Sequence, residues 1–285
     1  MGTRNNPLAR VQLLGPVRAW QDERELELGP PRQRAVFAVL AMHTNKTVSR
    51  DELVDGVWGD DPPASAVNSV YIYVAGLRRA LEPDRGRRAP ATILASSGAG
   101  YQLRLEPGQP DAVAFGRHLA KARTLRAEGD LASAVRSLEA ASALWQEAPL
   151  SGIPGSWAET ERVRLGEMWL TALEERTEIM LARGAHAEAA AELAGLVRGH
   201  PLRERFRGQL MLALYRCGRQ AEALAVFAQT RRMLIDELGV EPGPELQRLH
   251  EQILAADENL CLSRAAGAGR RGRPAMCAHR RVRRR

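Results

Sequence analysis

The chain has 285 residues, 45% of them hydrophobic, which is enough for two medium-sized domains with apolar cores. Its three cysteines, Cys217, Cys261 and Cys277, show neither an even number nor a paired spacing, which argues against a disulfide framework and a zinc site. No apolar run approaches the ~20 residues of a membrane span, so the sequence favours a cytoplasmic protein without a membrane partner.

The net charge of +7 comes from the C-terminal segment, residues 257–285. This segment holds nine Arg against Asp257 and Glu258, and the basic and acidic residues of 1–256 cancel. Bulk charge therefore does not make the rest of the chain a nucleic-acid binder. The segment has low complexity and no apolar period, so we expect it to be disordered. It is either a cationic arm that binds DNA phosphates nonspecifically or an extension without a function.

Residues 1–107 are predicted to form a small domain of strands and helices. The alternating runs VQLLGPVRAW and RELELG indicate strands, and a helical period begins at PRQRAVFAVLAMH. The Pro- and Gly-rich stretch LEPGQPD, residues 105–111, follows this domain. We place the domain boundary there, because no strand pattern recurs until the C-terminal segment begins.

A helix-turn-helix with a wing is predicted within this domain. Ser49 and Glu52 have the spacing of a capping box that opens a helix. The inner side of this helix carries Leu53, Val57 and Trp58. The turn GDDPPA leads to a second helix, and the later run TILASSGAGYQLRL predicts two short strands around Gly98 and Gly100. A phosphate loop at Gly-Ala-Gly is the weaker interpretation, since a strand follows it rather than a helix.

The helix from Ser65 to Leu81 has two unlike faces when its residues are placed at 100° intervals. The stripe predicted to lie in the core contains Val67, Val70, Val74, Leu77 and Leu81. The opposite face contains Ser65, Asn68, Ile72, Gly76 and Arg79, and Tyr71 flanks it. An amide, an apolar tip and a guanidinium match the adenine edges, thymine methyls and guanine acceptors of the DNA major groove, with Gly76 leaving space for a base edge or phosphate. The alternative is an ordinary amphipathic helix with a partly apolar exterior.

A helical repeat is predicted over residues 108–256. The runs GAHAEAAAEL from Gly184 and GRQAEALAVF from Gly218 start 34 residues apart, and GDLASAVRSL from Gly129 is a weaker copy. About 34 residues is the period of tetratricopeptide repeats, in which each helix pair packs on the next. A plain helical bundle with glycine in its turns is the alternative.

The sequence offers no catalytic constellation. Its six histidines lack a metal-binding spacing, and Asp60 and Asp61 fall in a Pro-rich turn without neighbouring ligands. Cys217 is interpreted as a small core residue rather than a nucleophile. The sequence therefore favours a protein that is not an enzyme and needs no metal or cofactor. Two functions stay open, a DNA-binding regulator and a helical-repeat scaffold for protein partners.

Two long stretches resemble known bacterial regulators. The first, PPRQRAVFAVLAMHTNKTVSRDELVDGVWGDDPPASAVNSVYIYVAGLRRAL followed by GAGYQL, is similar to the winged helix-turn-helix of OmpR-type response regulators. The second, HPLRERFRGQLMLALYRCGRQAEALAVFAQTRRMLIDELGVEPGPELQRLHEQIL, resembles the bacterial transcriptional activator domain of the Streptomyces antibiotic regulatory protein family. The likeness covers about residues 10–256, and ELGVEPGPEL after GRQAEAL is highly specific.

The resemblance implies an α+β winged helix-turn-helix domain with a four-stranded N-terminal sheet, followed by an all-α tetratricopeptide-like helical-repeat domain. It also implies a dimer on promoter direct repeats of double-stranded DNA, contact with RNA polymerase holoenzyme, and activation of secondary-metabolite genes. Arg50 matches a position that touches phosphate, and Trp58 matches one that packs near the DNA backbone. The base-facing positions correspond to Ser69, Tyr71, Ile72, Ala75 and Gly76.

The sequence departs from the family pattern at three of the positions implied to lie near DNA. Many relatives have Arg or another polar residue where Ala75 and Gly76 stand, and many OmpR-type wings have a basic residue where Ser97 stands. These departures imply a weak or altered operator, and they are the best support for the scaffold alternative.

Overall fold

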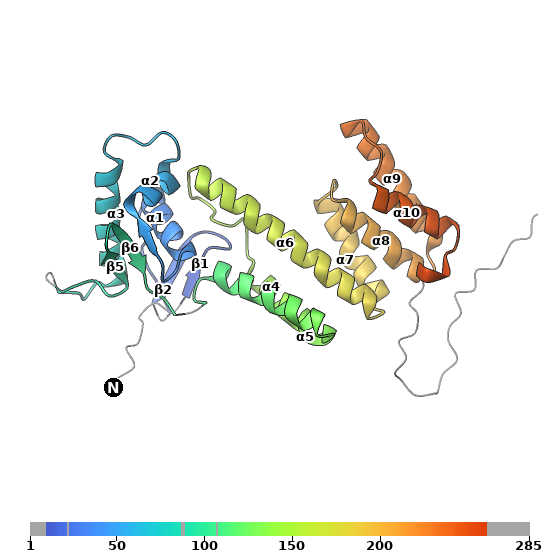
Figure 1. Ribbon diagram of the computed structural model, residues 1–285, viewed down its shortest axis with the longest axis horizontal. Coiled ribbons are helices and arrows are strands. Elements are labelled where there is room, and N and C mark those ends of the chain that lie inside the picture. Colours follow the sequence, from blue (N-terminus) through green and yellow to red (C-terminus); the bar gives the residue numbers. More distant parts are fainter. Residues whose placement is uncertain (1–9, 22, 87–88, 107, 261–285) are drawn as a thin grey trace, which may run out of the picture. The chain divides into compact units, whose positions relative to one another are not determined.

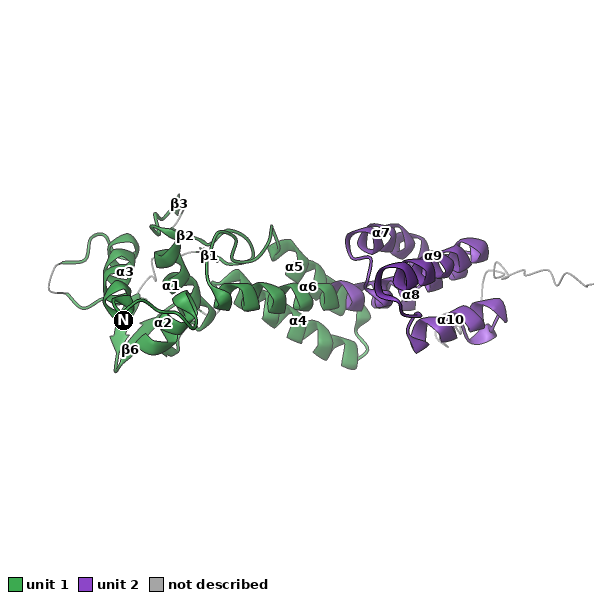
Figure 2. Ribbon diagram, turned by 90° about the horizontal axis from the view of Figure 1, so that it is seen from above, with its two compact units in different colours: residues 1–172 green, residues 173–285 purple. Residues whose placement is uncertain are grey.

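The computed structural model describes residues 10–21, 23–86, 89–106 and 108–260 (Figure 1). The chain divides into two compact units, residues 1–172 and 173–285, and the division falls within the long helix α6, Ser156–Ala182 (Figure 2). The first unit holds the sheets and the first helices, and the second unit is helical. Every helix in the described part of the chain is too short or too polar to span a bilayer.

The first sheet has three antiparallel strands within the described residues. They are β1 (Arg10–Gln12), β2 (Arg18–Gln21) and β3 (Arg24–Glu25). Trp20 on the central strand pairs with Arg10 on one side and Glu25 on the other. The structure thus shows three strands here, where the family resemblance implies four. Soon after β3, Gly29 at φ +84° and two prolines turn the chain into the next helix, and a proline has no N–H to extend a strand pair.

Three helices follow this sheet and build the predicted helix-turn-helix. They are α1 (Pro31–Met42), α2 (Arg50–Trp58) and α3 (Ala66–Leu81). The capping box is confirmed, because the Glu52 N–H donates to Ser49 Oγ at 3.1 Å and the Ser49 N–H donates to Glu52 Oε2 at 2.7 Å. These two bonds satisfy backbone donors that the first turn of α2 leaves without helical partners.

The predicted hairpin wing is also confirmed. β5 (Leu94–Ser97) and β6 (Gly100–Leu103) pair antiparallel, and β4 (Thr47–Ser49) pairs with the other edge of β6. Gly98 adopts φ +56° in the turn of the hairpin. Gly100 lies opposite Ser49, and a Cβ at Gly100 would lie 2.0 Å from the carbonyl oxygen of Val48. A side chain at Gly100 would therefore separate the wing from β4.

α3 packs against α1, α2 and β5 with most of its predicted stripe. The stripe residues that are buried are Val70, Val74, Leu77 and Leu81. The prediction for Val67 is wrong, because Val67 is 43% exposed. Ala66 is the buried residue of the first turn instead. The buried face of the helix is therefore rotated toward Ala66, relative to the predicted stripe.

Two further helices of the first unit pack on each other, and the first of them contacts β1. They are α4 (Asp111–Ala127) and α5 (Leu131–Leu144). The carboxylate of Asp111 accepts the N–H groups of Leu13 at 2.7 Å and Leu14 at 3.1 Å, which links α4 to the segment after β1. Burial raises the pKa of Asp111, and these backbone hydrogen bonds act in the opposite direction. Trp145 stacks on Trp169 with ring centroids 4.9 Å apart and so joins the end of α5 to α6.

The predicted all-α domain is confirmed, and the turns at its three repeat positions share one geometry. The later helices are α7 (His186–Gly199), α8 (Glu204–Arg216), α9 (Gln220–Leu238) and α10 (Pro244–Leu254). Gly129, Gly184 and Gly218 lie between successive helices at φ +82°, +86° and +78°. After each glycine, the next N–H donates to the carbonyl five positions earlier, at 2.9, 3.0 and 2.9 Å. The weaker copy at Gly129 therefore has the same turn geometry as the other two.

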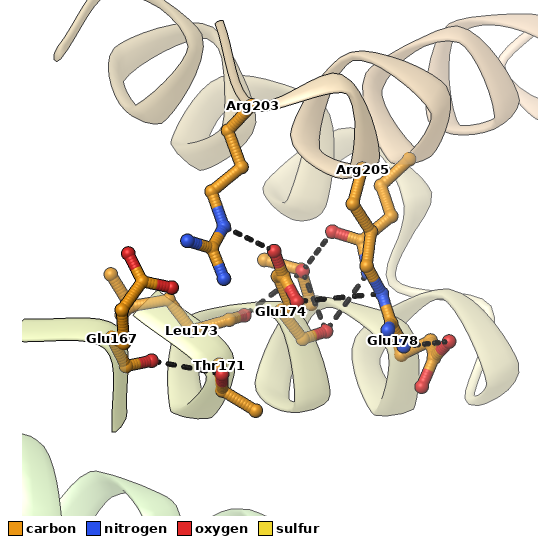
Figure 3. Close-up of polar contacts among 9 residues, drawn as sticks. Glu167, Thr171, Leu173, Glu174, Glu178, Arg203 and Arg205 are labelled. Atoms are coloured by element: carbon orange, nitrogen blue, oxygen red, sulfur yellow. Dashed lines mark hydrogen bonds and ion pairs between the residues drawn. The ribbon is translucent and has the colours of Figure 1, made fainter. Parts of the chain in front are cut away.

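A buried carboxylate connects two helices of the second unit (Figure 3). Glu174 on α6 lies with its Oε1 2.6 Å from Arg203 Nε and its Oε2 3.5 Å from Arg205 Nε. Arg205 also pairs with Glu178, one turn further along α6, at 3.0 Å. The Glu174 side chain is only 5% exposed, so two guanidinium groups balance its charge where water has little access.

The ordered structure extends past the predicted start of the C-terminal segment. Residues Glu258–Leu260 form a short 3-10 helix, Leu260 is buried, and its carbonyl accepts a hydrogen bond from Arg216 Nε at 2.8 Å. The prediction that the segment is disordered from Asp257 is therefore wrong for its first four residues, because Leu260 has an apolar site to fill. Residues 261–285, with Cys261, Cys277 and the nine Arg, lie outside the described residues.

Candidate nucleic-acid interface

The outward face of α3 carries most of the predicted base-reading residues. The exposed members of this face are Ser65, Asn68, Ile72, Ala75 and Arg79. Ser69 is half-buried beside them, and its hydroxyl donates to the carbonyl of Ser65 at 3.1 Å. Arg79 Nε has only a long contact to the Ala75 carbonyl, at 3.4 Å. The amide of Asn68, the tip of Ile72 and the guanidinium of Arg79 are therefore presented together to solvent.

Gly76 lies where a side chain of α1 meets α3. A Cβ at Gly76 would lie 2.4 Å from Gln33 Oε1, because the side chain of Gln33 on α1 rests against this part of α3. Gln33 Nε2 in turn donates to the carbonyl of Leu28 at 2.9 Å. The missing side chain admits a glutamine of the same domain, and the approach of a base edge or phosphate at Gly76 stays a prediction.

Arg50 lies in the first turn of α2, beside the outward face of α3. It is half-buried, and its guanidinium carbon is 5.9 Å from the centre of the Tyr71 ring on α3. Tyr71 is 46% exposed, so the ring is partly covered and partly open to a ligand. Asp51 and Glu52 lie in the same first turn and offset the positive end of the α2 dipole, so the group here that can attract an anion such as a phosphate is the Arg50 guanidinium.

Arg78 was missed by the sequence prediction and connects α3 to the wing. Its Nε donates to the carbonyl of Leu94 at 2.9 Å, and Nη2 donates to Ser96 Oγ at 2.9 Å. Its guanidinium carbon lies 5.6 Å from the centre of the Tyr101 ring. Burial raises the pKa of Tyr101, the nearby Tyr71 adds to this, and the charges of Arg78 and Arg50 oppose it. In the sequence, Arg78 could be recognised only as a basic residue on the flank of the helix, which does not reveal its contacts with the wing.

Ser97, the predicted wing residue, is half-buried at the end of β5. Its Oγ accepts a hydrogen bond from Thr47 Oγ1 at 2.9 Å, across the sheet on β4. The hydroxyl of Ser97 therefore joins two strands and retains its own proton as a donor. A single hydroxyl at this place offers a neutral contact, where a basic residue would offer a charge.

Trp58 is placed between two other helices of the domain. Its ring stacks on Tyr73 of α3, with centroids 6.3 Å apart and an interplanar angle of 18°. Arg32 in the first turn of α1 holds its guanidinium carbon 5.9 Å from the Trp58 ring centre. The indole Nε1 of Trp58 is buried without a hydrogen-bond partner among the described residues. The sequence prediction did not include Arg32 as a site residue. The first turn of α1 has no acidic residue to offset the charge of Arg32.

The fold and this surface define a winged helix-turn-helix regulator with a helical-repeat domain. Residues 23–103 match the family of transcriptional regulatory proteins, C-terminal domain, and residues 110–254 match the bacterial transcriptional activator domain. The described residues contain no group of three or more His, Cys, Asp or Glu arranged to hold a metal ion.

Curated relatives and a solved structure align with most of the chain. The regulatory protein AfsR of Streptomyces coelicolor is 46% identical over 91% of this chain and 25% of AfsR. The regulatory protein DnrI of Streptomyces peucetius is 34% identical over 88% of this chain and 94% of DnrI. The structure of Mycobacterium tuberculosis EmbR in complex with a low-affinity phosphopeptide is 32% identical, with a TM-score of 0.80, and covers 88% of this chain and 65% of that chain.

The chain therefore belongs to the Streptomyces antibiotic regulatory protein family of transcriptional regulators. It spans about a quarter of the length of the AfsR proteins that it matches.

Proposed function

We propose that this chain is a sequence-specific DNA-binding activator of transcription. Residues 1–107 bind double-stranded promoter DNA, and residues 108–256 contact RNA polymerase holoenzyme. The target is a set of secondary-metabolite genes, as the name of the family suggests. The observation that carries the proposal is the outward face of α3, where an amide, an apolar side chain and a guanidinium are exposed together beside a wing.

The proposed reading contacts come from α3. The major groove admits one helix, and bidentate contacts of Asn with adenine and of Arg with guanine are its most selective side-chain contacts. Asn68 and Arg79 are exposed on the same face and supply these two groups. Ser65 and Ser69 add hydroxyls near the start of the helix, where the groove wall would lie.

The proposed phosphate contacts come from the helices on either side of α3. Arg50 and Arg32 occupy the first turns of α2 and α1, and each supplies a guanidinium to a phosphate. Trp58 stacks on Tyr73 beside Arg32 and is proposed to support these contacts near the DNA backbone. Groups of this kind position a protein on the duplex without selecting its sequence.

The helical-repeat domain is proposed to bind protein. Residues 108–256 hold 18 basic and 20 acidic residues, so their charge gives no attraction to DNA phosphates. Two copies of the chain on a promoter direct repeat would bring two of these domains to one polymerase. Direct repeats require a head-to-tail arrangement, in which each copy occupies the same face of the DNA about one helical turn from the next.

The scaffold function stays as the second candidate, and a specific observation favours it. Three positions where many relatives carry polar or basic groups toward DNA offer no charge in this chain: Ala75 has a methyl group, Gly76 packs on Gln33, and Ser97 has a hydroxyl that bonds Thr47. Arg79 is then the main exposed cation on the reading face of α3.

A DNA-binding measurement at fixed salt separates the two functions. The full chain would be presented with a random duplex library, and the enriched sequence would be used for footprinting with wild type and Asn68→Ala. Loss of a base contact should weaken binding to the enriched site by about tenfold to a hundredfold and leave nonspecific binding unchanged. No enriched sequence, or equal footprints for Asn68→Ala and Arg79→Ala and wild type, would favour the scaffold.

A further inference from the structure

A groove lies on the second unit, where the last turns of α6 meet α8 and α10. Its volume is about 920 Å³. The leucines that line it are Leu181, Leu212, Leu246 and Leu249. Leu181 and Leu246 are buried, whereas Leu212 and Leu249 are only half-buried. Two leucine side chains that stay open to a concave surface suit an apolar ligand.

The charges around this groove favour a cationic ligand. Three glutamates and two arginines line it, and one of these arginines, Arg205, is already paired with glutamates of α6 (Figure 3). Glu204 accepts the N–H of Gly243, a neutral group, at 2.8 Å. Glu245 is exposed in the first turn of α10. The groove therefore combines leucine side chains with an excess of carboxylate charge, and its complement is an apolar segment flanked by cations.

The chain itself leads to the edge of this groove. Leu260, the last described residue, is buried, and its carbonyl accepts a hydrogen bond from Arg216 Nε at 2.8 Å. Arg216 lines the groove, and its Nη1 also donates to the carbonyl of Leu181, another lining residue, at 3.3 Å. Residue 261 therefore continues the chain from a point beside the groove.

The sequence of residues 261–285 has the composition that complements the groove. It contains nine Arg and no acidic residue, and the short run Pro-Ala-Met-Cys-Ala at 274–278 lies between two clusters of Arg. Pro274 comes fourteen residues after Leu260, and extended chain of this length spans up to about 45 Å. The run can therefore reach any part of the groove.

We propose that residues 274–278 bind in this groove of the same chain. Met276 packs against Leu212 and Leu249, and the arginines on either side of the run face the carboxylate of Glu245. Methionine adapts to an irregular apolar surface, and the exposed ion pairs contribute more to selectivity than to strength. While it is bound, the segment covers part of the domain that is proposed to bind protein, so it competes with a protein partner for this surface.

The test uses Cys277, which lies inside the proposed bound run. The rate at which N-ethylmaleimide modifies this thiol is measured by mass spectrometry in the full, reduced chain and in a synthetic peptide of residues 264–285. The peptide has the same neighbouring residues and no groove. Glu245→Arg and Met276→Glu should each release the segment. Glu188→Arg is the matched control, because Glu188 is also an exposed glutamate in the first turn of a helix, α7, and it does not line the groove.

The expected result is protection of Cys277 that depends on both sides of the contact. In wild type and in Glu188→Arg, Cys277 should react about tenfold more slowly than in the peptide, as expected from burial of one apolar side chain and a few exposed ion pairs. In Glu245→Arg and Met276→Glu, it should react at nearly the rate of the peptide. Thermal unfolding checks the fold of Glu245→Arg, and Met276→Glu changes none of the residues that form the groove.

Four outcomes would overturn the proposal. Equal rates in the full chain and the peptide would mean that the run is not bound. Protection that persists in Met276→Glu or in folded Glu245→Arg would place the run elsewhere. Protection that falls on dilution would show that the run binds a second copy. Protection that appears only when duplex DNA is added would identify the segment as a cationic arm for phosphates.

Discussion

Replacing Arg78 by alanine should loosen the wing from α3, whereas the same change at Arg79 should leave the fold intact. The two arginines are neighbours on one helix and have the same charge, so they form a matched pair. Arg78 donates to Leu94 and Ser96 of the wing, while Arg79 is exposed and makes only the long contact to Ala75.

The size of the effect follows from the contacts of Arg78. A hydrogen bond from a charged donor contributes about 1.5–3 kcal/mol when water is excluded, and its contact with Tyr101 adds up to about 1 kcal/mol. Arg78 is half-buried, so water replaces part of these interactions in the variant. We expect Arg78→Ala to lower the free energy of unfolding by about 2 kcal/mol and the melting temperature by about 4–8 °C. Arg78→Lys should recover only part of this, because an ammonium cannot make both bonds of the guanidinium fork.

Two measurements test the predicted roles of Arg78 and Arg79. They are thermal unfolding of the full chain and affinity for the enriched duplex. Arg78→Ala should reduce both stability and DNA affinity, since the wing loses its fixed distance from α3. Arg79→Ala should reduce DNA affinity at an unchanged melting temperature. Equal melting temperatures for the two alanine variants would refute the reasoning that Arg78 holds the wing.

Three further predictions concern stability. Val74→Asp should leave the N-terminal domain unfolded in circular dichroism, because it places an unpaired charge among fully buried side chains. The Ser49 backbone N–H, followed by the Ser49 side chain, lowers the pKa of Glu52, so the capping box stabilises above the ordinary pKa of a glutamate and loses this effect as pH falls through the lowered pKa. Glu52→Gln should therefore lower the melting temperature more at pH 7 than at about pH 3. A chain ending at Ala256 should melt below one ending at Leu260, by an amount that reflects about 1–2 kcal/mol of lost burial; equal melting temperatures would show that Leu260 contributes nothing.

The features that the sequence predicted best are those with local causes. The capping box depends on two residues three positions apart, and the turns at Gly129, Gly184 and Gly218 depend on a backbone conformation that glycine favours. The wing could be predicted in the same way from glycines between short alternating runs. Each of these signals lies within a few residues of the structure it produces.

The sequence prediction missed contacts at the candidate site where distant segments meet. Gly76 meets Gln33, which lies on α1 and contacts it only after the helices pack. Arg78 was passed over because its partners are backbone and hydroxyl groups of the wing, which no periodicity reveals. Periodicity gave the apolar face of α3 but not its tilt against the core, and Val67 at the edge of that face was therefore misplaced.

The distribution of charge suggests where the proposed affinity for the operator comes from. Outside residues 257–285 the chain has no net charge, so attraction to DNA rests on local cations such as Arg32, Arg50 and Arg79. Each phosphate contact contributes only about one unit to the dependence of affinity on salt, so one copy with so few contacts would bind weakly. A second copy on the adjacent repeat would raise the affinity through effective concentration without any new phosphate contact. The base contacts of α3 and the pairing of two copies would then matter more than the total charge of the protein.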